Sequence, residues 1–343
     1  MTSATAAATA EGRNLELERA RVHGFIYGVL WEPDRPGREL TWEDLDGALL
    51  DPDAVLWLHF NAANAHAREW LSQCPRLPEA LRRFLLDRDD RKRLDLVAEG
   101  IIGVISDVHY GFDFDPDQIA LLRFYLDARC LISTRHQPLS ATDELRRVIR
   151  GGLRVENTAS LLANLFELQA AMLGNVAARL NREVGDIEDQ VLAERIHDQR
   201  GKLGAIRRLA VRLHRHFAPE LRSLQHLCAR HPAWFRDTDV RGLRQRTEEL
   251  NEVVDDLDTI QERAKLLQEE LAGRVAEMTS RNLVILSIVT TVFLPITLIT
   301  GIFGMNVAGL PGLEDRSAFW WVMMGMAGVV LIVLILLHWK RLF

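Results

Sequence analysis

Residues at spacings of three and four follow one line along an otherwise apolar stretch, and the line carries most of the hydroxyl side chains of that stretch. The residues on this line are Ser280, Leu283, Ser287, Thr290, Leu294, Thr297 and Gly301, followed directly by Gly304, Met305 and Asn306. This spacing places the first seven along one stripe of a helix. Neutral hydroxyl and amide oxygens suit contact with a hydrated or partly hydrated divalent cation. The stripe therefore suits a pore-facing path for ions. Because residues 283–303 contain no carboxylate or thiolate, a cation on this path would stay hydrated or partly hydrated.

The same hydroxyls have a second interpretation, which is purely structural. Ser and Thr in apolar helices also bond to their own backbone or to a neighbouring helix, where small and polar residues favour close packing. A path for ions and a helix contact both remain open at this point.

Two apolar runs frame the end of the stripe and predict a membrane-spanning helical hairpin. Residues 283–303 and 318–339 carry no charge, and each is close to the roughly 20 residues that span a bilayer core. Only helices or closed barrels satisfy the backbone in lipid, and runs this apolar are helices. Pro295 is tolerated in such a helix because neighbouring groups can satisfy the carbonyl that it frees.

The flanking charges predict the orientation of the hairpin. Positive residues precede the first run and follow the second, and positive residues stay on the cytoplasmic side. Both termini are therefore expected inside and residues 304–317 outside. Glu314 and Asp315 in that external loop are expected to attract cations.

One hairpin cannot enclose a channel, so the interpretation as a pore requires a homo-oligomer with the first span of each copy around an axis. The tripeptide Gly304-Met305-Asn306 lies between a proline-bearing first span and a second span. In that setting the chain resembles the CorA superfamily of divalent metal transporters. Residues 307–312, Val-Ala-Gly-Leu-Pro-Gly, are similar to the zinc-transporting ZntB branch, whereas magnesium members usually carry an acidic Met-Pro-Glu-type loop.

The resemblance implies a funnel-shaped homopentamer in a bacterial-type inner (plasma) membrane that transports Zn²⁺. Transport of Mg²⁺, Co²⁺ or Ni²⁺ is the alternative within the superfamily, since oxygen ligands by themselves do not favour zinc. Outside it, the alternative is a membrane-tethered coiled-coil scaffold or sensor with the hairpin as an anchor. No catalytic grouping predicts an enzyme, and no cofactor is expected.

The composition is consistent with a large soluble region before the membrane. The 343 residues carry a net charge of −6, which gives no basic surface for nucleic acid. Cys74, Cys130 and Cys228 are far apart, a pattern without zinc-site or disulfide spacing. Residues 1–13 are expected to be a disordered tail, and we find no signal peptide in them.

Residues 14–152 are expected to form an α+β sandwich domain. Runs rich in β-branched and aromatic residues predict strands over residues 25–31, 54–60, 94–98, 101–109, 120–126 and 130–134. Helices are predicted around residues 41–45, 65–71, 78–86 and 142–149.

The remaining soluble residues predict long helices. Residues 153–236 are expected to form antiparallel helices, over residues 158–197 and 203–231, and residues 237–282 a stalk helix continuous with the first span. Residues 340–343 form a short cytoplasmic tail. Apolar residues of the stalk keep a heptad spacing, with Leu250, Val253, Leu257, Ile260, Ala264, Leu267, Leu271 and Met278. Its many acids are either solvated faces or, in an oligomer, rings that concentrate cations.

Overall fold

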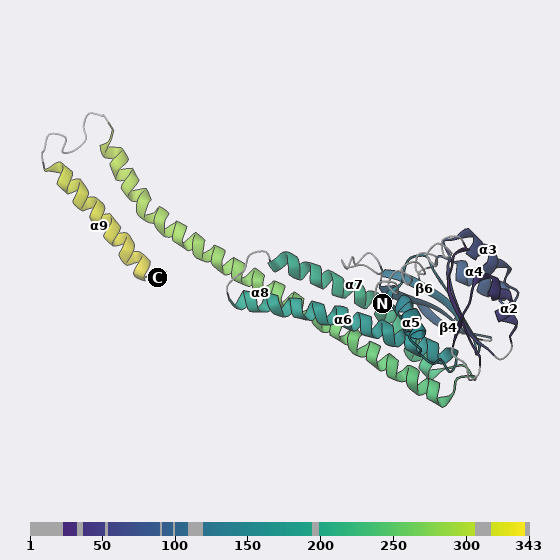
Figure 1. The fold of residues 1–343 in the computed structure, drawn as a ribbon. Helices are drawn as coiled ribbons and strands as arrows, with labels where there is room; N and C mark the ends of the chain where they lie inside the picture. Colours follow the sequence, from purple (N-terminus) through teal and green to yellow (C-terminus); the bar gives the residue numbers. More distant parts are fainter. Residues whose placement is uncertain are drawn as a thin grey trace, which may run out of the picture. The chain divides into compact units, whose positions relative to one another are not determined.

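The computed structural model describes residues 23–32, 37–51, 54–89, 91–98, 100–108, 119–193, 199–305 and 317–339. The chain divides into two compact units, Met1–Leu266 and Leu267–Phe343, and each is described by itself. A mixed α/β region, long helices and two apolar helices follow one another along the chain (Figure 1), as the sequence predicts. The tail predicted at residues 1–13 lies outside the described residues.

A seven-stranded mixed sheet organises the first unit, in the order β2-β1-β3-β7-β6-β5-β4. Its strands are β1 Phe25–Trp31, β2 Arg38–Glu39, β3 Val55–Asn61, β4 Arg93–Val97, β5 Gly100–Val108, β6 Ile119–Leu126 and β7 Cys130–Arg135. β3 and β7 pair in parallel, and the other neighbours are antiparallel. The central strands β3 and β7 are buried along both faces, as strands covered on both sides are.

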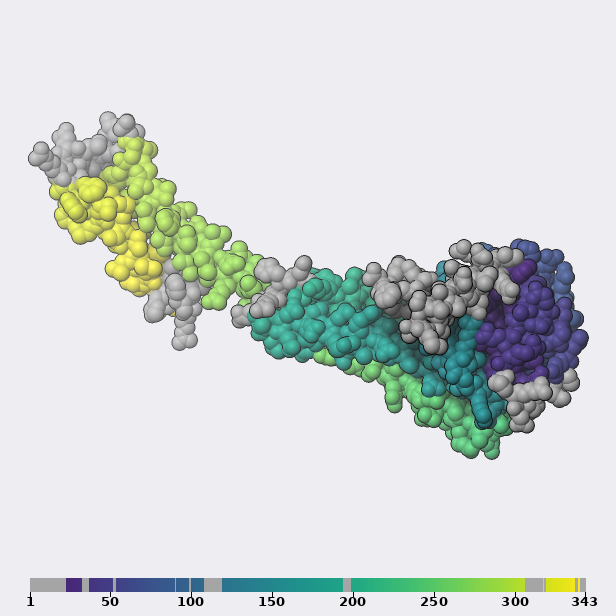
Figure 2. All heavy atoms as spheres, viewed as in Figure 1, coloured from purple at the N-terminus to yellow at the C-terminus, as the bar shows by residue number. Residues whose placement is uncertain are grey.

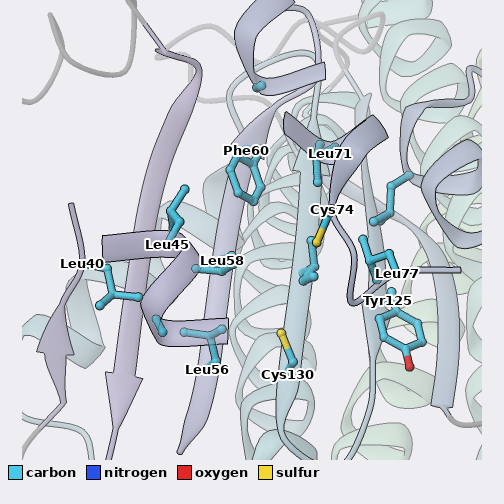
Figure 3. Close-up of a cluster of buried hydrophobic side chains, with 14 of the residues drawn as sticks. Leu40, Leu45, Leu56, Leu58, Phe60, Leu71, Cys74, Leu77, Tyr125 and Cys130 are labelled. Carbon is cyan, nitrogen blue, oxygen red and sulfur yellow. The ribbon is translucent and has the colours of Figure 1, made fainter. Parts of the chain in front are cut away.

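Three short helices cover one face of the sheet. They are α2 Leu45–Leu50, α3 Ala65–Gln73 and α4 Glu79–Leu86, and η1 Trp42–Asp44 leads into the first. Figure 3 shows the core beneath them, where Leu58 and Phe60 of β3 meet Leu45 and Leu71. The side chain of Asn64 starts α3 by accepting hydrogen bonds from the backbone of His66 and Ala67, which satisfies two amides at the helix start.

Longer helices cover the other face. They are α5 Ser140–Arg150, α6 Thr158–Leu192 and α7 Gln199–Ala229. Asp107 at the end of β5 fixes the start of α5, because its carboxylate accepts from the backbone N–H of Ala141 at 3.0 Å. Asn157 caps α6 in the same manner, through the backbone N–H of Ser160 at 2.7 Å.

A single helix of 67 residues, α8 Asp237–Phe303, carries the stalk and the first apolar run, and its atoms are coloured from green to yellow-green in Figure 2. Its heptad residues Leu250, Leu257, Ile260, Ala264, Leu267 and Leu271 are buried, as predicted. Val253 is only half-buried, and the adjacent Val254 takes the buried position. Met278, also predicted on this face, is 54% exposed. Side-chain contacts join α8 to α6 and α7. Arg246 forms an ion pair with Glu167 and Arg263 with Glu188, and Nε2 of His214 lies 3.3 Å from the carboxylate of Asp258.

The predicted elements are present with small shifts at their ends. β2 was not predicted, since two exposed residues carry no pattern of their own. α6 ends at Leu192, before the predicted end at residue 197, and residues 194–198 lie outside the described residues. The second apolar run forms α9 Ala318–Trp339, with the predicted bounds.

Candidate functional site

Three described helices are long and apolar enough to cross a membrane. Surface exposure separates them. In α6 the most apolar segment is 44% buried within the protein, whereas in α8 and α9 none of the corresponding segment is buried. The apolar face of α6 is used by the bundle and the sheet, and the apolar surfaces of α8 and α9 have no such cover.

The predicted stripe runs along the uncovered side of α8. Its residues within the span are all exposed: Leu283, Ser287, Thr290, Leu294, Thr297 and Gly301. Val284, Ile288, Val292 and Ile299, which lie off the stripe, are half-covered, although Ile285 is 54% exposed. On α9 the half-covered residues Val322, Met326, Val329 and Val333 also share one face, and α9 belongs to the same compact unit. The hydroxyl stripe is therefore not the face of α8 that its own hairpin covers.

An open groove follows this uncovered face. It is lined by Thr290, Leu294, Thr297, Gly301 and Met305, together with apolar neighbours from the same helix. The groove brings five of the predicted site residues onto one continuous surface. Ser287 and Leu283 continue the same face below it.

The threonine hydroxyls of the span donate to their own backbone. Thr290 bonds to the carbonyl oxygen of Leu286 at 2.9 Å, and Thr297 to that of Phe293 at 2.8 Å. These are the local contacts of the structural interpretation. They use only the donor of each hydroxyl, however, and the oxygen keeps lone pairs that can accept from water. The groove therefore presents acceptors, which suits the hydration shell of a cation.

Gly304 ends the helix at a point where a side chain would be in tight contact with the preceding turn. Its N–H donates to the carbonyl of Thr300 at 2.9 Å, and a Cβ atom added at Gly304 would lie 3.0 Å from that carbonyl oxygen. This close approach favours a residue without a side chain at position 304. Met305 follows and is 49% exposed. Asn306, Glu314 and Asp315 lie outside the described residues.

The stripe has an extension in the stalk that was not predicted. Counting back from Ser280 in alternating steps of four and three reaches Ala276, Gly273, Glu269, Leu266, Glu262, Thr259, Asp255, Glu252 and Glu248, and each is exposed. The acids of the stalk were predicted as one group, without separation by register. The same alternation of three and four residues, continued back along the sequence, identifies the exposed line.

A buried acidic cluster in the first unit was also missed. Glu220 on α7 is 1% exposed and accepts from the backbone N–H of Ser106 and the side chain of Gln169, both at 2.7 Å. Burial, with the nearby carboxylate of Asp107, raises the pKa of Glu220 to about 8 despite these hydrogen bonds. The sequence does contain a signal for this buried carboxyl group. Glu220 lies three residues after Phe217 and four before Leu224, on the face of α7 where the neighbouring buried residues are apolar. Within the described residues, no three His, Cys, Asp or Glu side chains are grouped to hold a metal.

Comparison with known proteins agrees with this arrangement. The family model of the CorA-like Mg2+ transporter protein matches residues 52–341. The chain belongs to the CorA-like transporter family. It is 27% identical over 276 residues to the zinc transport protein ZntB of Yersinia enterocolitica, with 79% of this chain and 84% of the relative covered.

A second relative of the CorA-like family is as similar. The divalent cation transporter CmaX of Pseudomonas aeruginosa is 28% identical over 308 residues, which cover 89% of this chain and 93% of the relative. The solved structure of full-length CmaX matches with a TM-score of 0.79 and 27% identity, covering 93% of this chain and 98% of CmaX.

Membership of the CorA-like family defines the class of activity. The chain is a divalent cation transporter of the inner membrane, with α8 and α9 as its spans, and it is not an enzyme. CorA-family transporters act as oligomers.

Proposed function

We propose that this protein is a homopentameric Zn²⁺ transporter whose ions pass along an axis lined by the stripe of α8 from each copy. One observation carries the proposal: the hydroxyl stripe is exposed while the opposite residues of the span are half-covered. A water-filled axis is where polar groups of a membrane helix belong, because lipid cannot satisfy them. Ser287, Thr290 and Thr297 would then contact the hydration shell, and Leu283 and Leu294 would form narrower apolar rings.

The ends of this path have separate roles in the proposal. Asn306 at the outer end offers a carbonyl oxygen to the ion or its water, and donors that hold the loop closed. Glu314 and Asp315 raise the local cation concentration outside. Both termini lie in the cytoplasm, in accordance with the positive residues that flank the hairpin.

The choice of zinc rests on similarity rather than on the chemistry of the stripe. Support comes from residues 307–312 and from the likeness to ZntB, although CmaX is equally similar. Flux of Zn²⁺, Mg²⁺, Co²⁺ and Ni²⁺ into liposomes that contain the purified protein would test it. Zinc should enter fastest at equal concentrations, and preferential Mg²⁺ entry would reject zinc as the carried ion.

Cysteine labelling tests the pore-lining face independently of the ion. Thr290→Cys and Thr297→Cys should react with a small water-soluble maleimide, whereas Ile288→Cys and Ile299→Cys should stay inert. The unsubstituted protein is a suitable background because Cys74, Cys130 and Cys228 are buried, which raises the pKa of each thiol. Labelling that follows the isoleucines and spares the threonines would place the axis on the other face.

A further inference from the structure

The outward face of α7 carries charges of one sign. Along residues 199–229, all of which are described, the exposed ionisable side chains are Arg200, Lys202, Arg208, Arg215, Arg222 and His226. The acid of this helix, Glu220, is buried beside β5. A helix face that serves only solubility commonly alternates charges of both signs. A face with basic groups alone is instead suited to an acidic partner.

Three of these arginines form one line along α7. Arg208, Arg215 and Arg222 are seven residues apart, close to two turns, so their side chains leave the helix on the same side. Within the described parts of the chain, none of the three forms an ion pair with a carboxylate. The described part of one copy therefore does not neutralise this line.

The outward face of α8 carries the opposite charge. Between residues 245 and 262 the exposed ionisable side chains are all acidic. They are Glu248, Glu252, Asp255, Asp256, Asp258 and Glu262. Both faces belong to the first compact unit, which ends at Leu266. A single unit therefore presents a basic face on one helix and an acidic face on another.

Two contacts determine how α7 and α8 run past each other. The thiol of Cys228 lies 3.4 Å from the hydroxyl of Thr247, and Nε2 of His214 lies 3.3 Å from the carboxylate of Asp258. The later residue of α7 thus meets the earlier residue of α8. The two helices are antiparallel, and residues 214–228 of α7 lie level with residues 247–258 of α8.

Arg222 and Glu252 show what this alignment means for an assembly. Both lie between the two contacts and are level with each other along the bundle. They form no ion pair within the described part of one copy, because the faces that carry them point in different directions. In a ring of copies that stand side by side along their bundles, rotation keeps each residue at its own level. Arg222 of one copy then lies level with Glu252 of the next.

We infer that the basic face of α7 binds the acidic face of α8 in a neighbouring copy. The inference rests on the proposed homopentamer but not on which ion is carried. A head-to-tail contact uses one basic and one acidic face from every copy, and a closed ring leaves neither uncovered. A lipid surface or a nucleic acid on α7 would leave the acids of α8 without a partner. The complementary charges also fix which side of a copy receives its neighbour.

Cross-linking between two differently marked copies of the full-length protein tests the contact. Co-expressed Arg222→Cys and Glu252→Cys copies should give a covalent dimer with a short bis-maleimide. Either variant alone should give none, because a head-to-tail contact does not bring equal residues together. Asn175→Cys in place of Arg222→Cys is the matched control, since Asn175 is exposed but lies on α6, and it should give no dimer with Glu252→Cys.

A change of charge tests what holds the two faces together. Arg215→Glu added to the Arg222→Cys copies should lower the dimer yield at least about threefold, whereas Arg215→Lys keeps the charge and should leave the yield unchanged. The contact is overturned if the dimer is absent from an oligomer that elutes intact, or if the two Arg215 variants give equal yields.

The remaining outcomes separate this contact from the alternatives. Protection of the α7 arginines from phenylglyoxal that appears only with anionic phospholipid would assign their face to a lipid surface and overturn the contact. Elution of the unsubstituted protein as a monomer would reject the proposed homopentamer together with the contact. An intact oligomer without the covalent dimer would reject the contact alone.

Discussion

The hydroxyl of Thr290 donates to the carbonyl oxygen of Leu286 at 2.9 Å, and its neighbour Thr291 makes the same bond to Ser287 at 2.7 Å. Both threonines are exposed, but only Thr290 lies on the stripe. The local hydrogen bond is therefore common to both, and the direction in which the oxygen faces distinguishes them. Substituting each threonine in turn therefore distinguishes a structural role of the hydroxyls from a role in conduction.

Thr290→Val should lower cation flux at least about tenfold, because it removes an oxygen from every copy and one such contact contributes about 1 kcal/mol. Thr291→Val loses the same backbone bond and should leave flux unchanged. Metal entry into liposomes, normalised to the amount of assembled protein, provides the measurement. Equal losses in the two variants would show that the hydroxyls act only on their own helix.

Gly304→Ala should reduce flux strongly, because the added methyl group would lie 3.0 Å from the carbonyl oxygen of Thr300 and would displace the end of α8 beside Asn306. Gly325→Ala on α9 is the control, since its methyl group would meet nothing within 4 Å. Flux and the elution volume of the oligomer are compared for both. Normal transport by Gly304→Ala would show that the helix end tolerates a shift and that the tripeptide needs no close approach there.

Neutralising Glu314 and Asp315 to Gln and Asn should weaken the apparent affinity for the cation at low ionic strength only. The effect of these acids is electrostatic, and salt screens it over about 10 Å at 0.1 M and about 3 Å at 1 M. Flux is measured against metal concentration at both salts. A loss of the same size at 1 M salt would indicate that the carboxylates coordinate the ion directly.

The two spans and the stripe could be predicted because they depend on one helix at a time. Apolar length sets the bounds of α9, and a three-and-four spacing places Thr290 and Thr297 on one face wherever the helix lies. The buried heptad positions of the stalk were predicted for the same reason. The sequence did not predict which of two neighbouring apolar residues at the edge of that face is buried. Val253 and Val254 are both apolar, and only packing against the bundle selects the second.

Contacts between distant parts of the chain could not be predicted. The backbone of Ser106 meets the side chain of Glu220 across 114 residues, and Ser133 meets Trp57 across 76. Each contact depends on the order of strands in the sheet and on which helix covers which face. Strand propensity identifies β5 and β7 as strands but contains no information on that order. The buried polar clusters of the first unit therefore became visible only in the structure.

Ser133→Ala should destabilise the first unit by about 1–3 kcal/mol, because it leaves buried polar groups unsatisfied. The Ser133 hydroxyl accepts from the indole N–H of Trp57 at 3.0 Å and contacts Nδ1 of His59 at 2.9 Å. Ser72→Ala is the control, since that hydroxyl is exposed and donates to the carbonyl oxygen of Glu69, three residues earlier. Denaturant unfolding followed by tryptophan fluorescence measures the difference, and equal midpoints would show that the cluster is not important for stability.

Glu220 should make the first unit less stable as the pH rises from about 5 to 8. Its pKa is about 8 in the folded protein against 4.5 in a free side chain, so in this window the folded protein keeps a proton that the unfolded chain releases. The free energy of unfolding should fall by at most about 1.4 kcal/mol per pH unit for this group, and should stop falling above pH 8.

Asp107, Gln169 and Lys92 face the carboxyl group and should keep their own contacts in Glu220→Gln. Thermal unfolding midpoints at pH 5, 6, 7 and 8 should therefore fall less steeply in that variant than in the unsubstituted protein. The exposed Glu183→Gln should follow the unsubstituted protein, and a Glu220→Gln profile parallel to both would mean that another buried group sets the pH dependence.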